Sequence, residues 1–127
     1  MSYKYLDAAA LRGKTITSIV QIGGDRIEIA TDDGKRYVMY HTQDCCESVR
    51  IYRIFGKLDS LIGSPLITAS QEISSECPSG VENPESLDES YTWTIYRFTT
   101  KDHHVRIYWL GESNGCYSES VDFEEIE

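Results

Sequence analysis

The segment DRIEIATDDGKRYVMYH constrains the fold more than any other part of the sequence. Apolar and polar residues alternate on both sides of its Asp-Asp-Gly-Lys turn, with Ile27 and Ile29 before the turn and Tyr37 and Met39 after it. Two alternating runs joined by Asp-Gly are typical of a tight β-hairpin, because Gly34 can adopt a positive φ without a Cβ clash. The segment therefore predicts two antiparallel strands joined by a short turn.

Runs with the same alternation, rich in β-branched and aromatic residues, occur on both sides of this hairpin. They are KTITSIVQIGG before it and CESVRIYRIFG, PLITASQEIS, YTWTIYRFTT, HHVRIYWLGES and CYSESVDF after it. YTWTIYRFTT and HHVRIYWLGES are joined by Lys-Asp and predict a second hairpin, with Trp93 and Ile95 on one face of its first strand. Val105, Ile107 and Trp109 share one face of its second strand.

Helical content is limited to two short segments. DAAALRG has an Asp cap, three alanines and a closing glycine, and Leu58 and Leu61 have the spacing of a single turn. We therefore expect a mainly β fold with a minor helical part, in a single domain over residues 1–127. A curved antiparallel sheet, a sandwich or a partly open barrel would all fit. The Ser-, Pro- and acid-rich stretch SSECPSGVENPESLDES predicts an exposed acidic loop over about residues 74–90.

Charge and hydropathy limit the partners of the chain. Twelve basic and 21 acidic residues among 127 give a net charge of −9, which repels phosphate backbones and argues against general nucleic-acid binding. No run approaches the roughly 18 apolar residues of a membrane span, and the N-terminal segment lacks the apolar centre of a signal peptide. We therefore expect a cytoplasmic protein that binds no membrane.

The four cysteines are expected to be reduced, because no secretory signal accompanies them. Cys45 and Cys46 are poor partners for each other, since neighbouring residues rarely reach disulfide geometry. A disulfide, if one forms, would use Cys77 or Cys116.

The heptapeptide HTQDCCE combines an imidazole, two carboxylates and two thiols. His41, Cys45 and Cys46 are candidate zinc ligands, but structural zinc usually needs cysteines spaced two to four residues apart. A thiol nucleophile with His41 as its base is the second hypothesis, although Asp44 and Glu47 would raise the pKa of a neighbouring thiol. We prefer a structural corner, in which Asp44 and Glu47 accept backbone N–H bonds while one cysteine faces inward and the other outward.

Arginine and tyrosine residues are interleaved along three of the predicted strands. Guanidinium groups pair with phosphates and aromatic rings stack on bases, so such a set could hold one small nucleotide despite the negative net charge. The alternative, which we prefer, is that these residues form ordinary cross-strand pairs on the solvent face of a sheet. The candidate ligand-binding residues are Arg50, Tyr52, Tyr96, Arg97, Arg106 and Tyr108.

Several separate segments resemble a family of small phage and bacterial domains of unknown function. They are HTQDCCESV with its D-C-C-E core, LIGSPLITASQEIS with its L-I-G-S-P turn, SYTWTIYRFTT, and GESNGCYSESVDF, which is similar to an S-N-G-x-Y-S-E ending. Together they extend from Gly13 to Phe123, and Cys116 departs from the pattern, which commonly has an aromatic residue there. The resemblance implies a phage or prophage origin and implies no activity.

These observations lead us to expect no catalytic residues and no cofactor. The leading hypothesis is a non-catalytic, phage-type accessory binding protein, active as a host-takeover or counter-defence factor in the cytoplasm of the host cell. It would bind a host protein through its acidic surface or sequester a small signalling nucleotide, and it would form a homo-oligomer. The alternatives are a thiol or metal-binding protein centred on HTQDCCE and a structural, virion-associated protein.

Overall fold

The computed structural model describes residues 3–82, 84 and 90–126. The elements in chain order are β1 (Tyr3–Tyr5), η1 (Ala8–Leu11), β2 (Ile16–Gln21), β3 (Arg26–Thr31), β4 (Arg36–Tyr40), β5 (Ser48–Phe55), η2 (Leu58–Leu61), β6 (Thr68–Ser74), β7 (Ser90–Thr99), β8 (His104–Ser113) and β9 (Asp122–Ile126). The two η elements are short 3₁₀ turns, and they coincide with the two predicted helical segments. The prediction of a mainly β fold is therefore confirmed.

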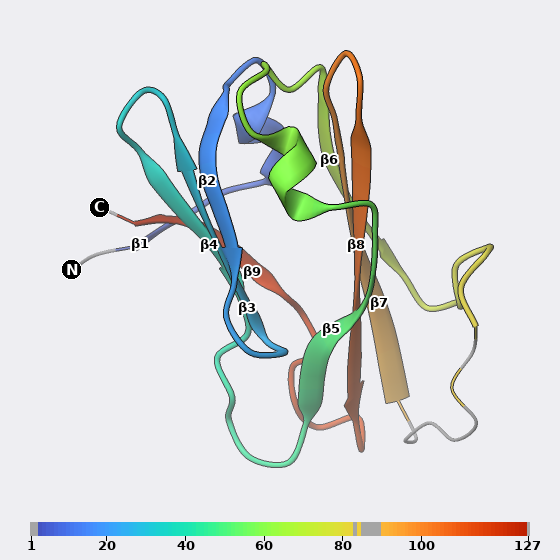
Figure 1. Cartoon of the computed structure of the whole chain (residues 1–127). Helices are drawn as coiled ribbons and strands as arrows, with labels where there is room; N and C mark the ends of the chain where they lie inside the picture. Colours follow the sequence, from blue (N-terminus) through green and yellow to red (C-terminus); the bar gives the residue numbers. More distant parts are fainter. Residues whose placement is uncertain (1–2, 83, 85–89, 127) are drawn as a thin grey trace.

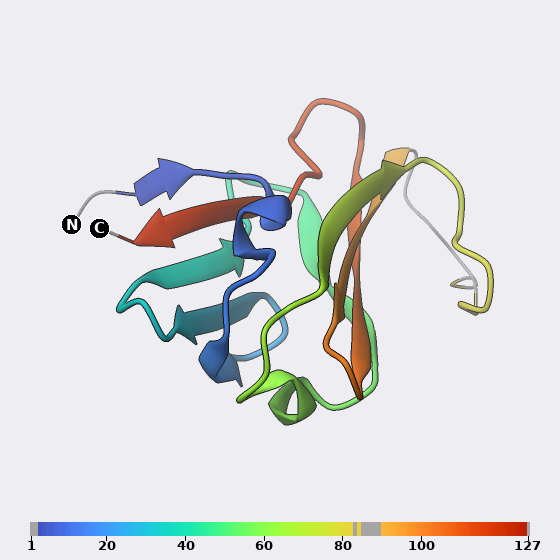
Figure 2. The ribbon, with the colours of Figure 1, turned by 90° about the horizontal axis from the view of Figure 1, so that it is seen from above.

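Within the described residues, the strands form two antiparallel sheets. The first sheet has five strands in the order β1-β9-β4-β3-β2, and the second has four in the order β5-β8-β7-β6. The two sheets face each other (Figures 1 and 2), so that of the three anticipated architectures the protein adopts the sandwich. η1 packs against β6 and η2 against both β2 and β8, so η2 bridges the two sheets.

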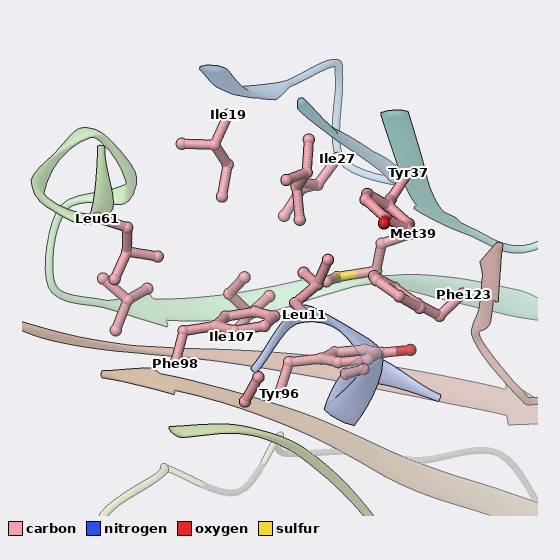
Figure 3. Close-up of a cluster of buried hydrophobic side chains, with 14 of the residues drawn as sticks. Leu11, Ile19, Ile27, Tyr37, Met39, Leu61, Tyr96, Phe98, Ile107 and Phe123 are labelled. Carbon is pink, nitrogen blue, oxygen red and sulfur yellow. The ribbon is translucent and has the colours of Figure 1, made fainter. Parts of the chain in front are cut away.

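The apolar faces of the two sheets form one core between them (Figure 3). Tyr37 and Phe123 of the first sheet stack with 5.9 Å between ring centroids, and Tyr96 of the second sheet approaches Phe123 at 6.1 Å. Trp109 Nε1 donates a hydrogen bond to the sulfur of Met39 at 3.2 Å. Because all five side chains are buried, aromatic packing between the sheets is a main source of cohesion.

β3 and β4 form the hairpin that the sequence predicts. Ile27 pairs with Met39 and Ile29 pairs with Tyr37 across the two strands, and all four side chains are buried in the core. Gly34 in the turn has φ +84°, a conformation that glycine adopts without steric cost.

β7 and β8 form the second predicted hairpin, and their register decides which aromatic residues reach the core. Val105, Ile107 and Trp109 belong to the core cluster between the sheets. Trp93 and Ile95 lie on the opposite, outer face, where Trp93 pairs with Leu110, yet both are buried. The outer face of this sheet therefore carries an apolar layer of its own.

The C-terminal part of the chain differs from the prediction in two respects. The last strand begins at Asp122 rather than at Cys116, because the Ser113 hydroxyl and the Asn114 side chain accept backbone N–H bonds and turn the chain into a loop. β1, which the sequence pattern does not indicate, pairs with β9 at the edge of the first sheet.

The acidic segment connects β6 to β7. β6 ends at Ser74 and β7 begins at Ser90. Glu76 and Glu82 are exposed, whereas residues 83 and 85–89 of the predicted loop lie outside the described residues. Across the described ranges, no helix is long and apolar enough to cross a membrane.

Candidate functional site

Glu47 organises the corner between β4 and β5. One carboxylate oxygen accepts hydrogen bonds from the Asp44 amide at 2.9 Å and His41 Nε2 at 2.8 Å, and the other accepts from the Cys45 amide at 2.9 Å. These donors, His41 first, hold the pKa of Glu47 at about 2, so the carboxylate is charged at neutral pH. Glu47 thus accepts backbone N–H bonds at the corner, whereas Asp44 donates its own backbone N–H to Glu47.

His41 joins this corner to the loop before β9. Its Nδ1 donates to the Ser120 carbonyl at 2.7 Å, while Nε2 faces the Glu47 carboxylate. Because a carbonyl and a carboxylate only accept hydrogen bonds, the ring satisfies both when both nitrogens carry protons. The His41 side chain is 4% exposed, so neither nitrogen is free to act as a base for Cys45 or Cys46.

Cys45 and Cys46 are bonded to each other in a disulfide. The expectation that adjacent cysteines would face opposite ways, and that a bridge would use Cys77 or Cys116, is therefore wrong; both of those cysteines are free. The physical reason is that residues 45 and 46 lie in an exposed bend outside any strand, where the alternation of a pleated strand does not apply.

The candidate metal ligands His41, Cys45 and Cys46 are engaged with other groups. The two sulfur atoms are bonded to each other, and the two ring nitrogens face Ser120 and Glu47. In the part of the chain that the structure describes, no group of three His, Cys, Asp or Glu side chains is placed to hold a metal ion.

A second buried carboxylate, Glu119, lies in the loop between β8 and β9. It accepts hydrogen bonds from the hydroxyls of Thr92 at 2.8 Å and Ser113 at 2.5 Å. Burial raises the pKa of Glu119, but the hydroxyls of Ser113, Ser90 and Thr92 outweigh burial and lower it. Sequence reasoning missed Glu119, whose only local signal is its place in a serine-rich segment.

Tyr96 lies on the core face of β7 and contacts Phe123 of the first sheet. Successive residues of a strand point to opposite faces, so the neighbouring Arg97 projects outward. The other five candidate ligand-binding residues, Arg50, Tyr52, Arg97, Arg106 and Tyr108, belong to the outer face of the second sheet. The prediction that Tyr96 belongs to the same set is wrong, because the register of β7 turns it into the core.

Three of the outer residues already have partners within the protein. Arg50 donates to the Glu112 carboxylate at 2.7 Å, and Arg97 donates to the Glu72 carboxylate at 2.7 Å. The Tyr52 hydroxyl donates to a loop carbonyl at 2.7 Å. The two arginines thus form cross-strand ion pairs, whereas Tyr52 bonds to the loop after β6.

Arg53 and Arg106 differ from Arg50 and Arg97 because they contact an aromatic ring and not a carboxylate. The Cζ atoms of Arg53 and Arg106 lie 5.7 and 4.9 Å from the centroid of the Phe55 ring. Arg106 also donates to the Tyr108 hydroxyl at 3.1 Å. In the described ranges neither guanidinium has a carboxylate within 4.0 Å, and the buried Nε of Arg106 has no hydrogen-bond partner. We call Arg53, Phe55, Arg106 and Tyr108 the cationic face.

Sequence reasoning missed the pairing of Arg53 with Phe55. The register of β5 against β8 shifts between Ile51 and Arg53, which is a β-bulge. The bulge sets Arg53 opposite Tyr108 and Phe55 opposite Arg106. A simple alternation cannot indicate this arrangement, because the extra residue changes the face on which the following residues lie.

A family model described as "Domain of unknown function (DUF7448)" matches residues 9–123. The chain belongs to this family. Comparison with curated proteins and with solved structures gave no match.

In this DUF7448 domain, two segments that are far apart in sequence meet at one end of the sandwich (Figure 1). The His41–Ser120 hydrogen bond joins the HTQDCCE corner to the loop before β9. At the corner, the buried side chains of His41 and Glu47 bond to each other. The cationic face lies along the outer side of β5 and β8. Within the described residues, the cationic face is the region whose guanidinium groups have no carboxylate partner.

Proposed function

We propose that this protein is a non-catalytic binding protein that takes up a small anionic, nucleotide-like ligand on the cationic face. The observation that carries the proposal is the position of Arg53 and Arg106 over the Phe55 ring without carboxylate partners in the described part of the chain. In a protein with a net charge of −9, most guanidinium groups would be expected to find a carboxylate. Within the described residues Arg53 and Arg106 have no such partner and lie over the same ring, so both are available to an external anion.

The chemistry of the cationic face suits a phosphorylated aromatic ligand. A guanidinium pairs with phosphate through two parallel hydrogen bonds, and a base stacks on an aromatic ring or on the guanidinium plane. Both arginines are on strands, so little backbone order has to be gained when a ligand binds.

A phage-encoded protein with this property would act in the host cell as a counter-defence factor. It would lower the free concentration of a signalling nucleotide by holding it, without changing it chemically. The alternative version, binding of a host protein through the acidic surface, is supported by the net charge and by the exposed Glu76 and Glu82. Such a complex would weaken with salt and would not depend on Arg53 or Arg106.

A thermal-shift assay with cyclic dinucleotides and ADP-ribose-type compounds tests the proposal. A ligand at about 100 times its Kd adds about 2.7 kcal/mol to the stability of the folded protein, which raises Tm by several degrees. Arg53→Gln with Arg106→Gln should abolish the rise. Arg12→Gln, which removes an exposed arginine elsewhere, should leave it unchanged. Sequestering is refuted if no compound in the panel changes Tm.

A further inference from the structure

The outer face of the first sheet is turned away from the second sheet (Figure 1). This face contains an open hollow of about 190 Å³. Its floor is formed by Val20, Ile22, Ala30 and Ile126. β2, β3, β4 and β9 are adjacent strands of one sheet, and these residues lie on the face opposite the core. The hollow therefore lies on the outer side of one hydrogen-bonded sheet, with Ile22 contributed by the connection between β2 and β3.

The floor of the hollow is unusually accessible to solvent. Val20 is 49% exposed and Ile22 is 44% exposed, whereas most large apolar side chains of this chain are buried. Covering such side chains with an apolar group is favourable, because apolar surface leaves water. The floor would thus stabilise the apolar part of a bound molecule.

The charges around the hollow favour an anion. Glu28 lines the hollow, but Arg26 Nε lies 2.8 Å from its carboxylate and offsets its charge. Arg36 also lines the hollow and, within the described residues, has no carboxylate within 4.0 Å. An apolar floor beside an arginine without a salt bridge is complementary to a molecule with an apolar body and one acidic group.

The size of the hollow favours a small molecule over a protein. A cavity of roughly 150 Å³ holds benzene, so this hollow accommodates a phenyl group or a short alkyl chain. A protein partner would need about 800 Å² of surface on each side, far more than the hollow offers. We infer that the hollow binds a small amphiphilic monocarboxylate, with its apolar body against Val20 and Ile22 and its carboxylate on Arg36.

A titration of the ¹⁵N-labelled protein with octanoate tests this inference, with octanamide as the uncharged ligand of nearly the same shape. Octanoate should cause saturable shifts of the amide signals of Ser18 to Ile22, Ala30 and Arg36. Arg36→Gln should weaken octanoate binding about tenfold, the loss expected for one charge-assisted hydrogen bond. It should leave the weaker octanamide binding unchanged. Arg12→Gln is the matched control and should have no effect on either ligand.

Three results would overturn the inference. Octanoate could fail to shift these signals below its micelle-forming concentration, or Arg36→Gln could bind octanoate as tightly as the unmodified protein. The same signals could also shift with protein concentration alone, which would show that a second copy of the chain covers the hollow. The cationic face lies on the other sheet, so none of these results bears on nucleotide binding.

Discussion

At the corner between β4 and β5, one carboxylate accepts hydrogen bonds from two backbone amides and an imidazole. The Asp44 amide and the Cys45 amide donate to different oxygens of Glu47, so neither oxygen is interchangeable with an NH₂ group. The sequence indicates a corner at this place because Asp44 and Glu47 follow the hairpin. It cannot indicate which carboxylate turns inward, because that depends on the loop that carries Ser120.

We predict that Glu47→Gln lowers the free energy of unfolding at neutral pH, because the amide NH₂ would face a backbone N–H. The folded-state pKa of Glu47 is about 2, below its ordinary value of 4.5, so its charge stabilises the folded state above pH 4.5. This stabilisation is lost as pH falls toward 2. Urea unfolding at stepwise lower pH should show the difference between Glu47→Gln and the unmodified protein shrinking over that range.

Asp32→Asn is the control for this series, since Asp32 is exposed on the hairpin turn. It should leave both the stability at neutral pH and its pH dependence nearly unchanged. A constant difference between Glu47→Gln and the unmodified protein at every pH would contradict the role assigned to the Glu47 charge.

The disulfide between Cys45 and Cys46 leads to a separate prediction about thiol labelling. Iodoacetamide added to the unfolded, unreduced protein should modify Cys77 and Cys116 and leave Cys45 and Cys46 unmodified, as read by intact mass. Labelling after reduction should modify all four. In the folded protein Cys77 should react slowly, because burial raises the pKa of its thiol. Four labels without reduction would disprove the bond.

At the scale of elements, local sequence patterns predict the hairpins correctly but do not predict which face of a strand points into the core. The β3–β4 hairpin follows from alternation and Gly34, which are properties of adjacent residues. The assignment of Tyr96 to the core and of Trp93 to the outer face follows from how β7 lies against β8 and the first sheet, which no local pattern contains. The bulge before Arg53 cannot be predicted from the local sequence either, because it depends on how β5 pairs with β8.

The close approach of β8 to the following loop depends on a glycine. A Cβ atom at Gly111 would lie 2.3 Å from the carbonyl oxygen of Glu119 and 2.8 Å from its Cβ. We predict that Gly111→Ala destabilises the protein by about 3 kcal/mol, because backbone rather than a flexible side chain must move.

Gly24→Ala is the matched control, as nothing lies within 4 Å of the corresponding position. Its cost in denaturant unfolding should stay near or below about 0.5 kcal/mol. Equal effects of the two substitutions would mean that the loop around Glu119 does not pack against β8 as described.

At the scale of the whole molecule, a strongly acidic chain carries a local face of opposite sign. The net charge of −9 correctly describes the long-range field, and the sequence also indicates that arginines and aromatic residues gather on strands. The sequence does not indicate which arginines pair with carboxylates. Arg50 and Arg97 bond to carboxylates, whereas Arg53 and Arg106 lie over the Phe55 ring. That separation is made by the packing of β5, β8 and β7 and by β6 at the edge of the sheet.

The most direct test of the account is a map of where a nucleotide binds. We would follow the amide and arginine Nε–H signals of the ¹⁵N-labelled protein during titration with the compound that raises Tm most in the thermal-shift panel. We predict saturable shifts of the Nε–H signals of Arg53 and Arg106 and of the amides around Phe55 and Tyr108. Shifts confined to the corner around His41 and Glu47, with the signals of Arg53 and Arg106 unchanged, would contradict it.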